Sequence, residues 1–517
     1  MGEKTRGAIA AGHQKTAEAG QIIFELGGNA FDAAIAAMLA SCVVESTLTS
    51  IGGGGFFLAH TKERQKILFD FFCQTPSQKK QIKDLDFYAV NLDFKGASQV
   101  FHIGLGSIAV PGTLAGIFEV HKQLGKLPFH VVAEPAIEYA RNGYQVTKYN
   151  RVTFEILEPI LTGSKNSQKL YAPDGNLLET GENAYIKDFA NILEELIKKG
   201  VQEFYQGEIA HQIIRDVSPG GHLTLEDLSQ YCVIKRHPIK FQYRGYEILT
   251  NPPPSSGGIL IAYCLKLLEN YPINSLEWGS KKHLEILAQV MALTNEARKM
   301  NYDNYVYQNN IVENFLSQEN LEKSHKKLEK TLNKWGSTTH ISVIDQEGNA
   351  ASVTNSNGEG SSYVIPNTGI MLNNMLGEAD LNPLGFHTWE SDRRISSMMS
   401  PSIILKEGKP EIVLGSGGSN RIRTAILQVI SNLLDFNLPL ENAINCPRVH
   451  WEDNIFNLEP MSQLGNFESL DLPPETQIVP WQEPGMFFGG VHGVKYGEAG
   501  TLEGFGDPRR AGVAIVC

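Results

Sequence analysis

The segment Thr338-Thr339-His340-Ile341-Ser342-Val343 constrains the fold more than any other stretch of this 517-residue chain. Polar and apolar residues alternate from His340 to Val343, which predicts a half-buried β-strand. Turn residues follow at 346–349, and residues 350–354 predict a returning strand. The two strands form a hairpin with Thr338 at its open end.

The position of Thr338 suggests nucleophilic catalysis. A threonine hydroxyl needs an adjacent base, and an α-amine, with a pKa of about 8, can serve as that base. This amine exists only if the chain is cut before Thr338. We therefore hypothesise that the Thr338 hydroxyl attacks the carbonyl of Ser337, that the peptide becomes an ester, and that water hydrolyses the ester. Gly336 gives the backbone freedom to present that carbonyl. Paired threonines also begin many strands without catalysing anything.

Several other motifs occur in an order that resembles the γ-glutamyltransferase family and together span nearly the whole chain. They are Glu25-Leu26-Gly27-Gly28-Asn29-Ala30-Phe31-Asp32-Ala33-Ala34, Ser50-Ile51-Gly52-Gly53-Gly54-Gly55-Phe56, Val110-Pro111-Gly112-Thr113-Leu114-Ala115-Gly116, Pro254-Ser255-Ser256-Gly257-Gly258, Leu372-Asn373-Asn374, Ser396-Ser397-Met398-Met399-Ser400-Pro401 and Asp507-Pro508-Arg509. Such collinearity is more specific than any single motif.

The resemblance implies a fold and a processing event. Members of the family are N-terminal-nucleophile hydrolases, made as one precursor that cuts itself before Thr-Thr-His. The resemblance therefore implies that Thr338 is the nucleophile. It also implies that residues 1–337 form a large subunit and residues 338–517 a small one, which associate as one interleaved domain. The expected fold class is α/β, an α+β four-layer αββα sandwich. No cofactor and no metal are expected.

Stabilisation of the acyl oxygen is expected from a glycine loop. Residues 411–419 run from a predicted strand into glycines, and backbone N–H groups in such a loop can form an oxyanion hole. The resemblance places that hole at Gly417 and Gly418, although the family's proline is missing and the second amide can instead belong to Ser419. A dinucleotide-binding loop is disfavoured, because its third glycine would fall on Asn420. By resemblance Ser356 supports the nucleophile's amine.

The donor pocket differs from that of the relatives. Phe72 stands where the family has an arginine that binds the donor carboxylate, and loss of such a contact costs about 1.5–3 kcal/mol. The alternative interpretation is that Phe72 packs in the core and has no role in the pocket. Ser396 and Ser397, which contact the donor carboxylate in the relatives, are retained. Arg393 lies near them in sequence, and it or another cation is expected to replace the missing arginine.

The amino-group side of the pocket has also changed. The family's asparagine falls on Gly358, with Asn357 beside it. A family glutamine or glutamate falls on Met375. A family aspartate falls on Glu378 or, with a short gap, on Asp380. The predicted substrate-binding residues are therefore Ser396, Ser397, Asn357, Glu378, Arg393 and Phe72.

Net charge, apolar segments and cysteine content limit the kinds of binding partner and the cellular location that we expect. The chain has 57 Asp and Glu against 45 Lys and Arg, a net charge of −12, which does not favour nucleic acid or an anionic membrane surface. The best membrane candidate, residues 33–44, is too short to span a bilayer. The six cysteines show no close pairing, which fits a reduced compartment, and the missing secretion signal suggests a cytoplasmic protein.

Helices are predicted from apolar residues at spacings of three and four. The predicted ranges are 15–26, 30–44, 109–124, 184–199, 258–268, 282–299 and 421–434. The polar stretch 313–334 is predicted to be a solvated helix or loop, and the alternative is a tail that becomes mobile after cleavage.

Three functions stay open from the sequence. The first, which we favour, is a γ-glutamyl hydrolase or transferase acting on small glutathione-like amides. The second is an amidase or acylase of the same fold that cleaves a more apolar acyl group, as Phe72 and Met375 suggest. The third is a binding or scaffold protein that no longer catalyses.

Overall fold

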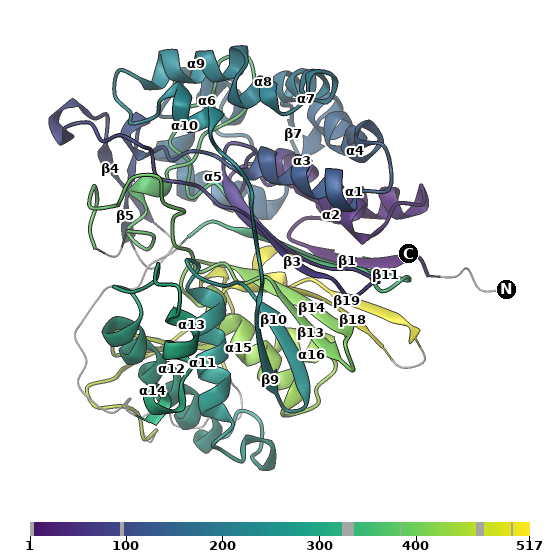
Figure 1. Ribbon diagram of the computed structural model, residues 1–517, viewed down its shortest axis with the longest axis vertical. Helices are drawn as coiled ribbons and strands as arrows, with labels where there is room; N and C mark the ends of the chain where they lie inside the picture. The colour runs from purple at the N-terminus through teal and green to yellow at the C-terminus, as the bar shows by residue number, and fades with distance from the viewer. Residues whose placement is uncertain (1–4, 94–97, 323–335, 383, 462–469, 498–499) are drawn as a thin grey trace.

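Two stacked antiparallel β-sheets between helical layers form the centre of the molecule in the computed structural model (Figure 1). The structure describes residues 5–93, 98–322, 336–382, 384–461, 470–497 and 500–517. This architecture confirms the four-layer αββα arrangement predicted from the sequence.

The first sheet mixes strands from both sides of Ser337. Its order is β20-β1-β11-β12-β2-β3-β8. The strands are β20 (Val513–Val516), β1 (Gly7–Ala11), β11 (Thr339–Asp345), β12 (Ala350–Ser356), β2 (Gly54–His60), β3 (Lys66–Phe71) and β8 (Ile234–Arg236). Because β11 pairs with β1 on one side and β12 on the other, the segments before and after Thr338 belong to one folded unit.

The second sheet has the order β19-β18-β14-β13-β10-β9 and packs face to face on the first. The strands are β19 (Leu502–Phe505), β18 (Gly490–Tyr496), β14 (Lys409–Gly417), β13 (Ser402–Lys406), β10 (Tyr246–Thr250) and β9 (Ile239–Tyr243). Strands β11 and β12 lie against β14, so one face of the predicted hairpin packs on the second sheet.

Helices cover the outer face of each sheet (Figure 1). The first sheet is covered by α1 (Gln14–Glu25), α2 (Ala30–Val44) and α3 (Thr113–Leu124), with α4 (Phe129–Asn142) beyond them. The second is covered by α11 (Gly257–Leu268), α15 (Arg421–Leu434) and α16 (Leu440–Asn445), and α12 (Lys281–Asn301) packs on α11. Two large apolar clusters fill the spaces between these layers.

The remaining elements are peripheral to the two sheets. They are α5 (Lys148–Leu161), α6 (Lys165–Tyr171), α7 (Lys187–Lys199), α8 (Gln202–Tyr205), α9 (Glu208–Val217), α10 (Leu225–Ser229), α13 (Ile311–Phe315), α14 (Gln318–Glu322), β4 (Tyr88–Asp93), β5 (Ser98–Ile103), β6 (Tyr144–Gln145), β7 (Asn183–Ala184), β15 (Val449–Glu452), β16 (Ile455–Leu458) and β17 (Gln477–Pro480). Helices α13 and α14 lie in the polar stretch 313–334 or at its start, and the part from 323 to 334 lies outside the described residues.

Strand β11 is buried on both faces, so the prediction of a half-buried strand is wrong. Ile341 and Val343 face the helix-covered core, as the alternation predicts. His340 and Ser342 face the second sheet instead of solvent. His340 Nδ1 lies 2.8 Å from Thr354 Oγ1, and Ser342 Oγ donates to the carbonyl of His492 at 3.0 Å. These bonds satisfy polar groups that alternation alone assigns to water.

The predicted helices exist, and several boundaries differ. Helix α2 has the predicted bounds, 30–44, whereas α3 begins at Thr113 instead of 109. Val110 pairs with Gln74 as a short bridge, and Pro111 and Gly112 then delay the helix. Helix α7 begins at Lys187 because residues 183–184 form a strand.

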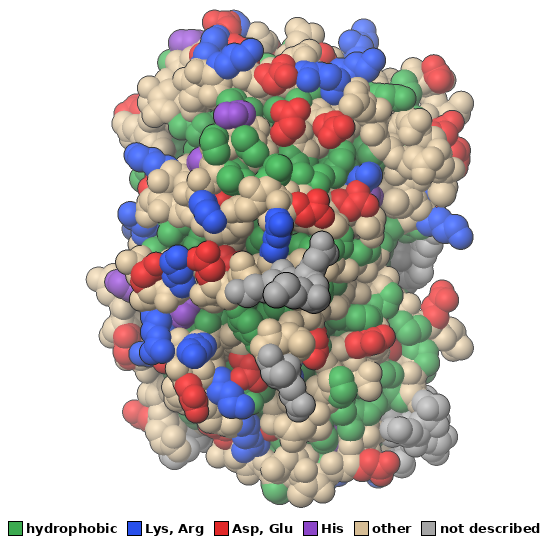
Figure 2. Space-filling model, turned by 90° about the vertical axis from the view of Figure 1, so that its right-hand side faces the viewer, with side chains coloured by type: hydrophobic (Ala, Val, Ile, Leu, Met, Phe, Trp, Pro, Cys, Tyr) green, Lys and Arg blue, Asp and Glu red, His purple; other side chains and the backbone are tan. Residues whose placement is uncertain are grey.

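Surface and cysteine properties bear on possible partners. Among the described residues no helix is both long and apolar enough to cross a bilayer. Figure 2 shows acidic and basic side chains interspersed on one face of the molecule. All six cysteines, each within the described part of the chain, are free thiols.

Candidate active site

Thr338 lies at the open end of the β11–β12 hairpin, as predicted, with Ser356 at the end of the opposing strand. In the intact chain the Thr338 hydroxyl donates to the carbonyl oxygen of Ser337 at 2.7 Å. The Ser356 hydroxyl donates to the same oxygen at 2.6 Å. Two hydroxyl groups therefore polarise the carbonyl of the peptide bond that precedes Thr338.

The loop after β12 orients Ser356. The amide of Gly358 donates to Ser356 Oγ at 2.9 Å, which leaves the hydroxyl proton free to point at Ser337. Ser337, Thr338 and Ser356 are all at least 93% buried, so these bonds form away from bulk water.

Glu359, which the sequence reasoning missed, holds Ser337 from the other side. The amide of Ser337 donates to Glu359 Oε1 at 2.9 Å, and Ser337 Oγ donates to Glu359 Oε2 at 2.5 Å. Burial raises the pKa of Glu359 to about 7, against the lowering effect of the Ser337 hydrogen bonds and of Arg510. In the sequence Glu359 is one acidic residue in a glycine-rich loop, a pattern that favours a solvated turn.

Two more acidic residues lie close to Glu359. The amide of Glu359 donates to Glu378 Oε1 at 3.2 Å, and the Ser419 hydroxyl donates to Asp380. Burial and the neighbouring Glu359 and Asp380 raise the pKa of Glu378 well above its usual value. The sequence left Glu378 and Asp380 as alternatives for one family position, and the structure brings both to the same cavity.

The family's asparagine position is closed by the fold. Gly358 has a φ of +62°, and a Cβ there would lie 2.1 Å from Asn374 Oδ1 and 2.9 Å from Glu378 Oε1. The side chain of Asn357 does not line the cavity. Asn357 Nδ2 reaches the carbonyl of Leu372 at 3.5 Å instead, because the residue after Ser356 points to the opposite side of the extended chain. The structure therefore does not bring Asn357 to the predicted site.

The glycine loop between β14 and α15 packs directly on Thr338. A Cβ on Gly417 would lie 2.1 Å from the carbonyl oxygen of Thr338, so only glycine fits there. Gly418 has a φ of +126°, which also requires glycine. Ser419 lines the cavity, whereas Gly417 and Gly418 do not. The assignment of the oxyanion hole to Gly417 and Gly418, or to Ser419, stays a prediction.

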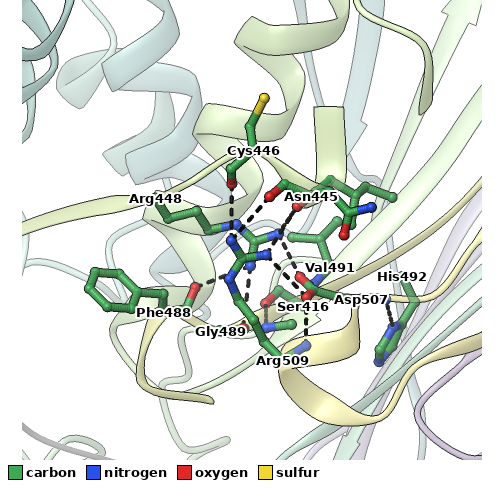
Figure 3. Close-up of polar contacts among 12 residues, drawn as sticks. Ser416, Asn445, Cys446, Arg448, Phe488, Gly489, Val491, His492, Asp507 and Arg509 are labelled. Atoms are coloured by element: carbon green, nitrogen blue, oxygen red, sulfur yellow. Dashed lines mark hydrogen bonds and ion pairs between the residues drawn. The ribbon is translucent and has the colours of Figure 1, made fainter. Parts of the chain in front are cut away.

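A buried network of ion pairs lies next to the strands that carry this loop (Figure 3). Asp507 pairs with Arg448 at 2.6 Å and accepts the amide of Val491 on β18 at 2.9 Å. Arg509 pairs with both Asp507 and Glu459. Since β18 pairs with β14 up to the loop, the Asp507-Pro508-Arg509 motif supports the site without lining it.

Phe72 fits both of the interpretations that the sequence left open. Its ring stacks on Phe56 with centroids 5.4 Å apart, and it also lines the cavity. Its carbonyl accepts a bond from Arg394 Nη1 at 2.5 Å, and the Arg394 guanidinium pairs with buried Asp70 at 3.4 Å. A cation is therefore close to the Phe72 backbone, but Asp70 already neutralises it.

Arg393 does not reach the site, and the expectation that it replaces the missing arginine is not supported. Its side chain is 52% exposed and pairs with exposed Glu390 at 3.0 Å. The main chain of Arg393 is fixed by two bonds to Thr75, one to the Arg393 amide and one to its carbonyl, each 2.9 Å long. The main chain of Arg393 is therefore held against Thr75, while its side chain points to solvent.

Ser396 and Ser397 lie beside the N-terminus of α11. Ser397 lines the cavity, and its Oγ accepts the amide of Met399 at 3.1 Å. Ser396 lies outside the lining, with its Oγ 3.0 Å from Ser256 Oγ. Of this pair, only Ser397 faces the cavity in the intact chain.

The cavity around Ser337 and Thr338 has a volume of about 40 Å³. Its lining residues are Phe72, Gly336, Ser337, Thr338, Ser356, Gly358, Met375, Glu378, Asp380, Leu381, Ser397, Met398, Met399, Ser419 and Ile422. The lining combines apolar side chains with the carboxyl groups of Glu378 and Asp380, and it contains no Lys or Arg among the described residues. Gly336 and Ser337 occupy part of the space in front of the nucleophile.

Comparisons with known proteins give matches over nearly the whole chain. The family model described as Gamma-glutamyltranspeptidase matches residues 16–517. The glutathione hydrolase proenzyme of Escherichia coli K12 is 30% identical, over 98% of this chain and 90% of the relative. An acylase ACY 1 proenzyme of Pseudomonas sp. SE83 is 29% identical, over 97% of this chain and 91% of the relative.

A solved structure extends the similarity to three dimensions. The crystal structure of cephalosporin acylase from Bacillus halodurans superposes with a TM-score of 0.84 at 25% identity, and the match covers 99% of this chain and 96% of that one. The similar proteins are named as a glutathione hydrolase and as acylases. The residues of the donor pocket are therefore the ones that must distinguish these activities.

Proposed function

Because this chain belongs to the γ-glutamyltranspeptidase family, we propose that it is a self-activating amidohydrolase that acts on γ-glutamyl amides through the Thr338 hydroxyl. The observation that carries the proposal is the 2.7 Å contact between Thr338 Oγ1 and the carbonyl oxygen of Ser337. This contact supports a nucleophile held against the bond that it must attack.

Activation proceeds by an acyl shift. Thr338 Oγ attacks the carbonyl carbon of Ser337, its proton passes to the departing nitrogen, and the C–N bond breaks. The product is an ester between Ser337 and the Thr338 hydroxyl, and Thr338 gains a free α-amine. Water then hydrolyses the ester, so Ser337 ends as a carboxylic acid and the hydroxyl is restored. Residues 1–337 and 338–517 become two subunits of the same interleaved fold.

Catalysis repeats this chemistry on an external amide. The Thr338 amine takes the hydroxyl proton, the oxygen attacks the donor carbonyl, and the leaving amine departs with the proton. Water or an acceptor amine then releases the acyl group from Thr338. In these steps we expect the Ser356 hydroxyl to support the amine and the Gly417–Ser419 loop to support the acyl oxygen.

The carboxylates in the cavity favour a γ-glutamyl donor. Glu378 and Asp380 are among the residues that line the cavity, and burying carboxylates is costly unless a cation joins them. The ammonium of a γ-glutamyl group supplies that cation. Its carboxylate then faces Ser397 and the N-terminus of α11, where backbone N–H groups favour an anion.

A second candidate, hydrolysis of a more apolar acyl amide, is favoured by the apolar residues of the cavity lining. They are Phe72, Met375, Leu381, Met398 and Ile422, and no Lys or Arg among the described lining residues replaces the family's arginine. An acyl group without a carboxylate needs no such cation.

Two chromogenic donors separate these candidates. Hydrolysis of L-γ-glutamyl p-nitroanilide is expected to exceed that of butyryl p-nitroanilide by about tenfold or more in kcat/KM, as a bound ion pair predicts. The reverse order would establish the acylase reading. Thr338→Ala serves as the inactive control, and addition of glycylglycine measures transfer against hydrolysis. A wild-type chain that stays uncut and cleaves neither donor would favour a scaffold protein.

We also propose a reducing, cytoplasmic location. Cys42, Cys73 and Cys264 are buried and unpaired, which fits a compartment that keeps thiols reduced. Cell fractionation against cytoplasmic and exported marker proteins tests this location.

A further inference from the structure

Glu359 makes contacts that none of the proposed chemical steps uses. Its two carboxylate oxygens receive the amide and the hydroxyl of Ser337, at 2.9 and 2.5 Å. The carboxylate therefore fixes both the backbone and the side chain of the residue whose carbonyl Thr338 attacks.

The loop that carries Glu359 has its own support. The backbone amides of Glu359 and Gly360 donate to Asn374 Oδ1 at 2.8 and 3.2 Å. Asn374 in turn donates to the carbonyl of His102 at 3.3 Å. Because these bonds hold the loop through its main chain, the side chain of Glu359 is not needed to shape it.

Burial of the Glu359 carboxylate is energetically unfavourable, so the contacts that it makes must compensate for that cost. The side chain is 2% exposed and lies near two other carboxylates, Glu378 and Asp380. Its closest hydrogen-bond donors are the two groups of Ser337. A carboxylate placed at such a cost, with both oxygens committed to one residue, fits a role in orienting that residue.

We propose that Glu359 is a positioning residue for self-cleavage, holding Ser337 so that its carbonyl stays against the hydroxyls of Thr338 and Ser356. The inference rests on the proposed cleavage between Ser337 and Thr338. Before the cut, Ser337 is pinned at three atoms: its amide and hydroxyl by Glu359, and its carbonyl oxygen by the two hydroxyl groups. Such fixation keeps the attacking hydroxyl beside the carbonyl group of Ser337.

The pH dependence of cleavage follows from the same contacts. The charged and titratable groups that face Glu359 are Glu378, Asp380, Arg510 and Tyr149, besides the hydroxyl of Ser337. Burial raises the pKa of Glu359 to about 7. Below that pH the carboxyl gains a proton on one oxygen and loses acceptor capacity toward Ser337. Cleavage is therefore expected to slow as the pH falls through about 7.

A double-mutant cycle tests the contact directly. The rate of appearance of the two fragments is measured for freshly purified wild type, Glu359→Gln, Ser337→Ala and the double variant. Glu359→Gln is expected to slow cleavage about 10- to 100-fold, since small misplacements of reacting groups have effects of that size. Ser337→Ala removes one of two bonds and is expected to slow it less. If the two residues act together, adding Ser337→Ala to Glu359→Gln slows cleavage by no more than about twofold.

Several controls separate a positioning role from a structural one. Glu347→Gln, which removes an exposed partner of Lys62, is expected to cleave at the wild-type rate. Folding is checked in a cleavage-blocked background by comparing melting temperatures of Thr338→Ala with and without Glu359→Gln. If Glu359→Gln does not fold, Glu359→Asp and the wild-type rate between pH 6 and 8 supply the test.

The outcomes distinguish the two proposals. Multiplicative effects of the two variants, a wild-type rate for Glu359→Gln, or a Glu359→Gln pH profile that still falls like the wild type would each overturn the inference. A wild-type chain that stays uncut, or a Thr338→Ala chain that cleaves, overturns the proposed self-cleavage instead.

Discussion

The hydroxyl of Ser356 donates to the carbonyl oxygen of Ser337 at 2.6 Å, across the open end of the hairpin. It is thus a hydrogen-bond donor to the oxygen on which charge develops during the attack. Ser356→Ala is expected to slow self-cleavage by about 10²- to 10³-fold, the effect of losing one such donor. Ser356→Thr keeps the hydroxyl and is expected to retain most of the rate. Densitometry of the fragments over time measures both.

The neighbouring Ser361 provides a matched control for Ser356. Its hydroxyl donates to the carbonyl of Leu372 at 2.8 Å and does not reach Ser337. Ser361→Ala is expected to cleave within about twofold of wild type. Equal slowing in both alanine variants would assign the effect to the loop rather than to the Ser356 hydroxyl.

Gly358 is expected to resist restoration of the family's asparagine. In Gly358→Asn the new Cβ would meet Asn374 Oδ1 at 2.1 Å, and overpacking of this kind costs about 1–3 kcal/mol. The variant is expected to melt at a lower temperature and to cleave more slowly. Gly348→Asn is the control, because Gly348 also has a positive φ, +89°, with no atom within 4 Å of its added Cβ. Similar losses in both variants would show that backbone strain, not the clash, is responsible.

Donor binding is expected to depend on Ser397 and not on Arg393. Arg393→Gln changes a side chain that pairs with Glu390 at the surface, so the donor KM of the processed enzyme is expected to stay within about twofold. Ser397→Ala removes a hydroxyl from the cavity lining, and loss of a hydrogen bond to a charged group predicts a rise in KM of about tenfold or more. A larger rise in the donor KM for Arg393→Gln than for Ser397→Ala would show that Arg393 does contribute to donor binding.

Asp507→Asn is expected to destabilise the precursor strongly. Asp507 pairs with buried Arg448 and Arg509, and removing one partner of a buried ion pair costs about 3–5 kcal/mol. Burial opposes this ionisation, yet the two arginines hold the pKa of Asp507 below its usual value. Urea unfolding in the Thr338→Ala background measures the loss. Exposed Asp174→Asn is the control and is expected to unfold at the same midpoint.

Acid is expected to destabilise the fold below about pH 6.5. Burial lowers the pKa of His13, His283, His450 and His492 to about 4. An unfolded histidine titrates near 6.5. Between pH 6.5 and pH 4 the unfolded chain therefore binds more protons than the folded chain, and the free energy of unfolding decreases as the pH decreases. Each histidine lowers the free energy of unfolding by up to about 1.4 kcal/mol for each pH unit below about 6.5, and above that pH its contribution to stability is complete.

Urea midpoints between pH 7.5 and 4.5 measure this dependence. His283→Gln is expected to reduce the slope, because it removes one buried group that must take up a proton. His237→Gln, at an exposed position, is expected to leave the slope unchanged. Equal slopes in wild type and His283→Gln would contradict the assignment.

Local sequence patterns were sufficient for the hairpin, for Thr338 at its open end and for the bounds of α2, whereas the association of Ser356 with Thr338 came from the family resemblance. These features depend on residue periodicity and on pairing within one short segment. The half-buried reading of β11 failed because alternation does not reveal that a second sheet covers the polar face. Ser342 donates to the carbonyl of His492 on that sheet, which comes from a distant part of the chain, and His340 lies beneath the sheet with Thr354 of the neighbouring strand as a partner.

The donor pocket was harder to predict for a related reason. Arg393 and Arg394 are neighbours in sequence, and only the structure shows that Arg394 is buried against Phe72 while Arg393 is exposed. Glu359 went unnoticed because its partner, Ser337, lies 22 residues away across the hairpin. Side-chain direction at such positions is set by tertiary contacts that sequence spacing does not contain.

Mass spectrometry with N-terminal sequencing of the active protein tests the central claim most directly. We predict two fragments, with Thr338 as the first residue of the lighter one, and a single uncut chain for Thr338→Ala. A lighter fragment that begins at any other residue, or full amidase activity from an uncut chain, would contradict the account.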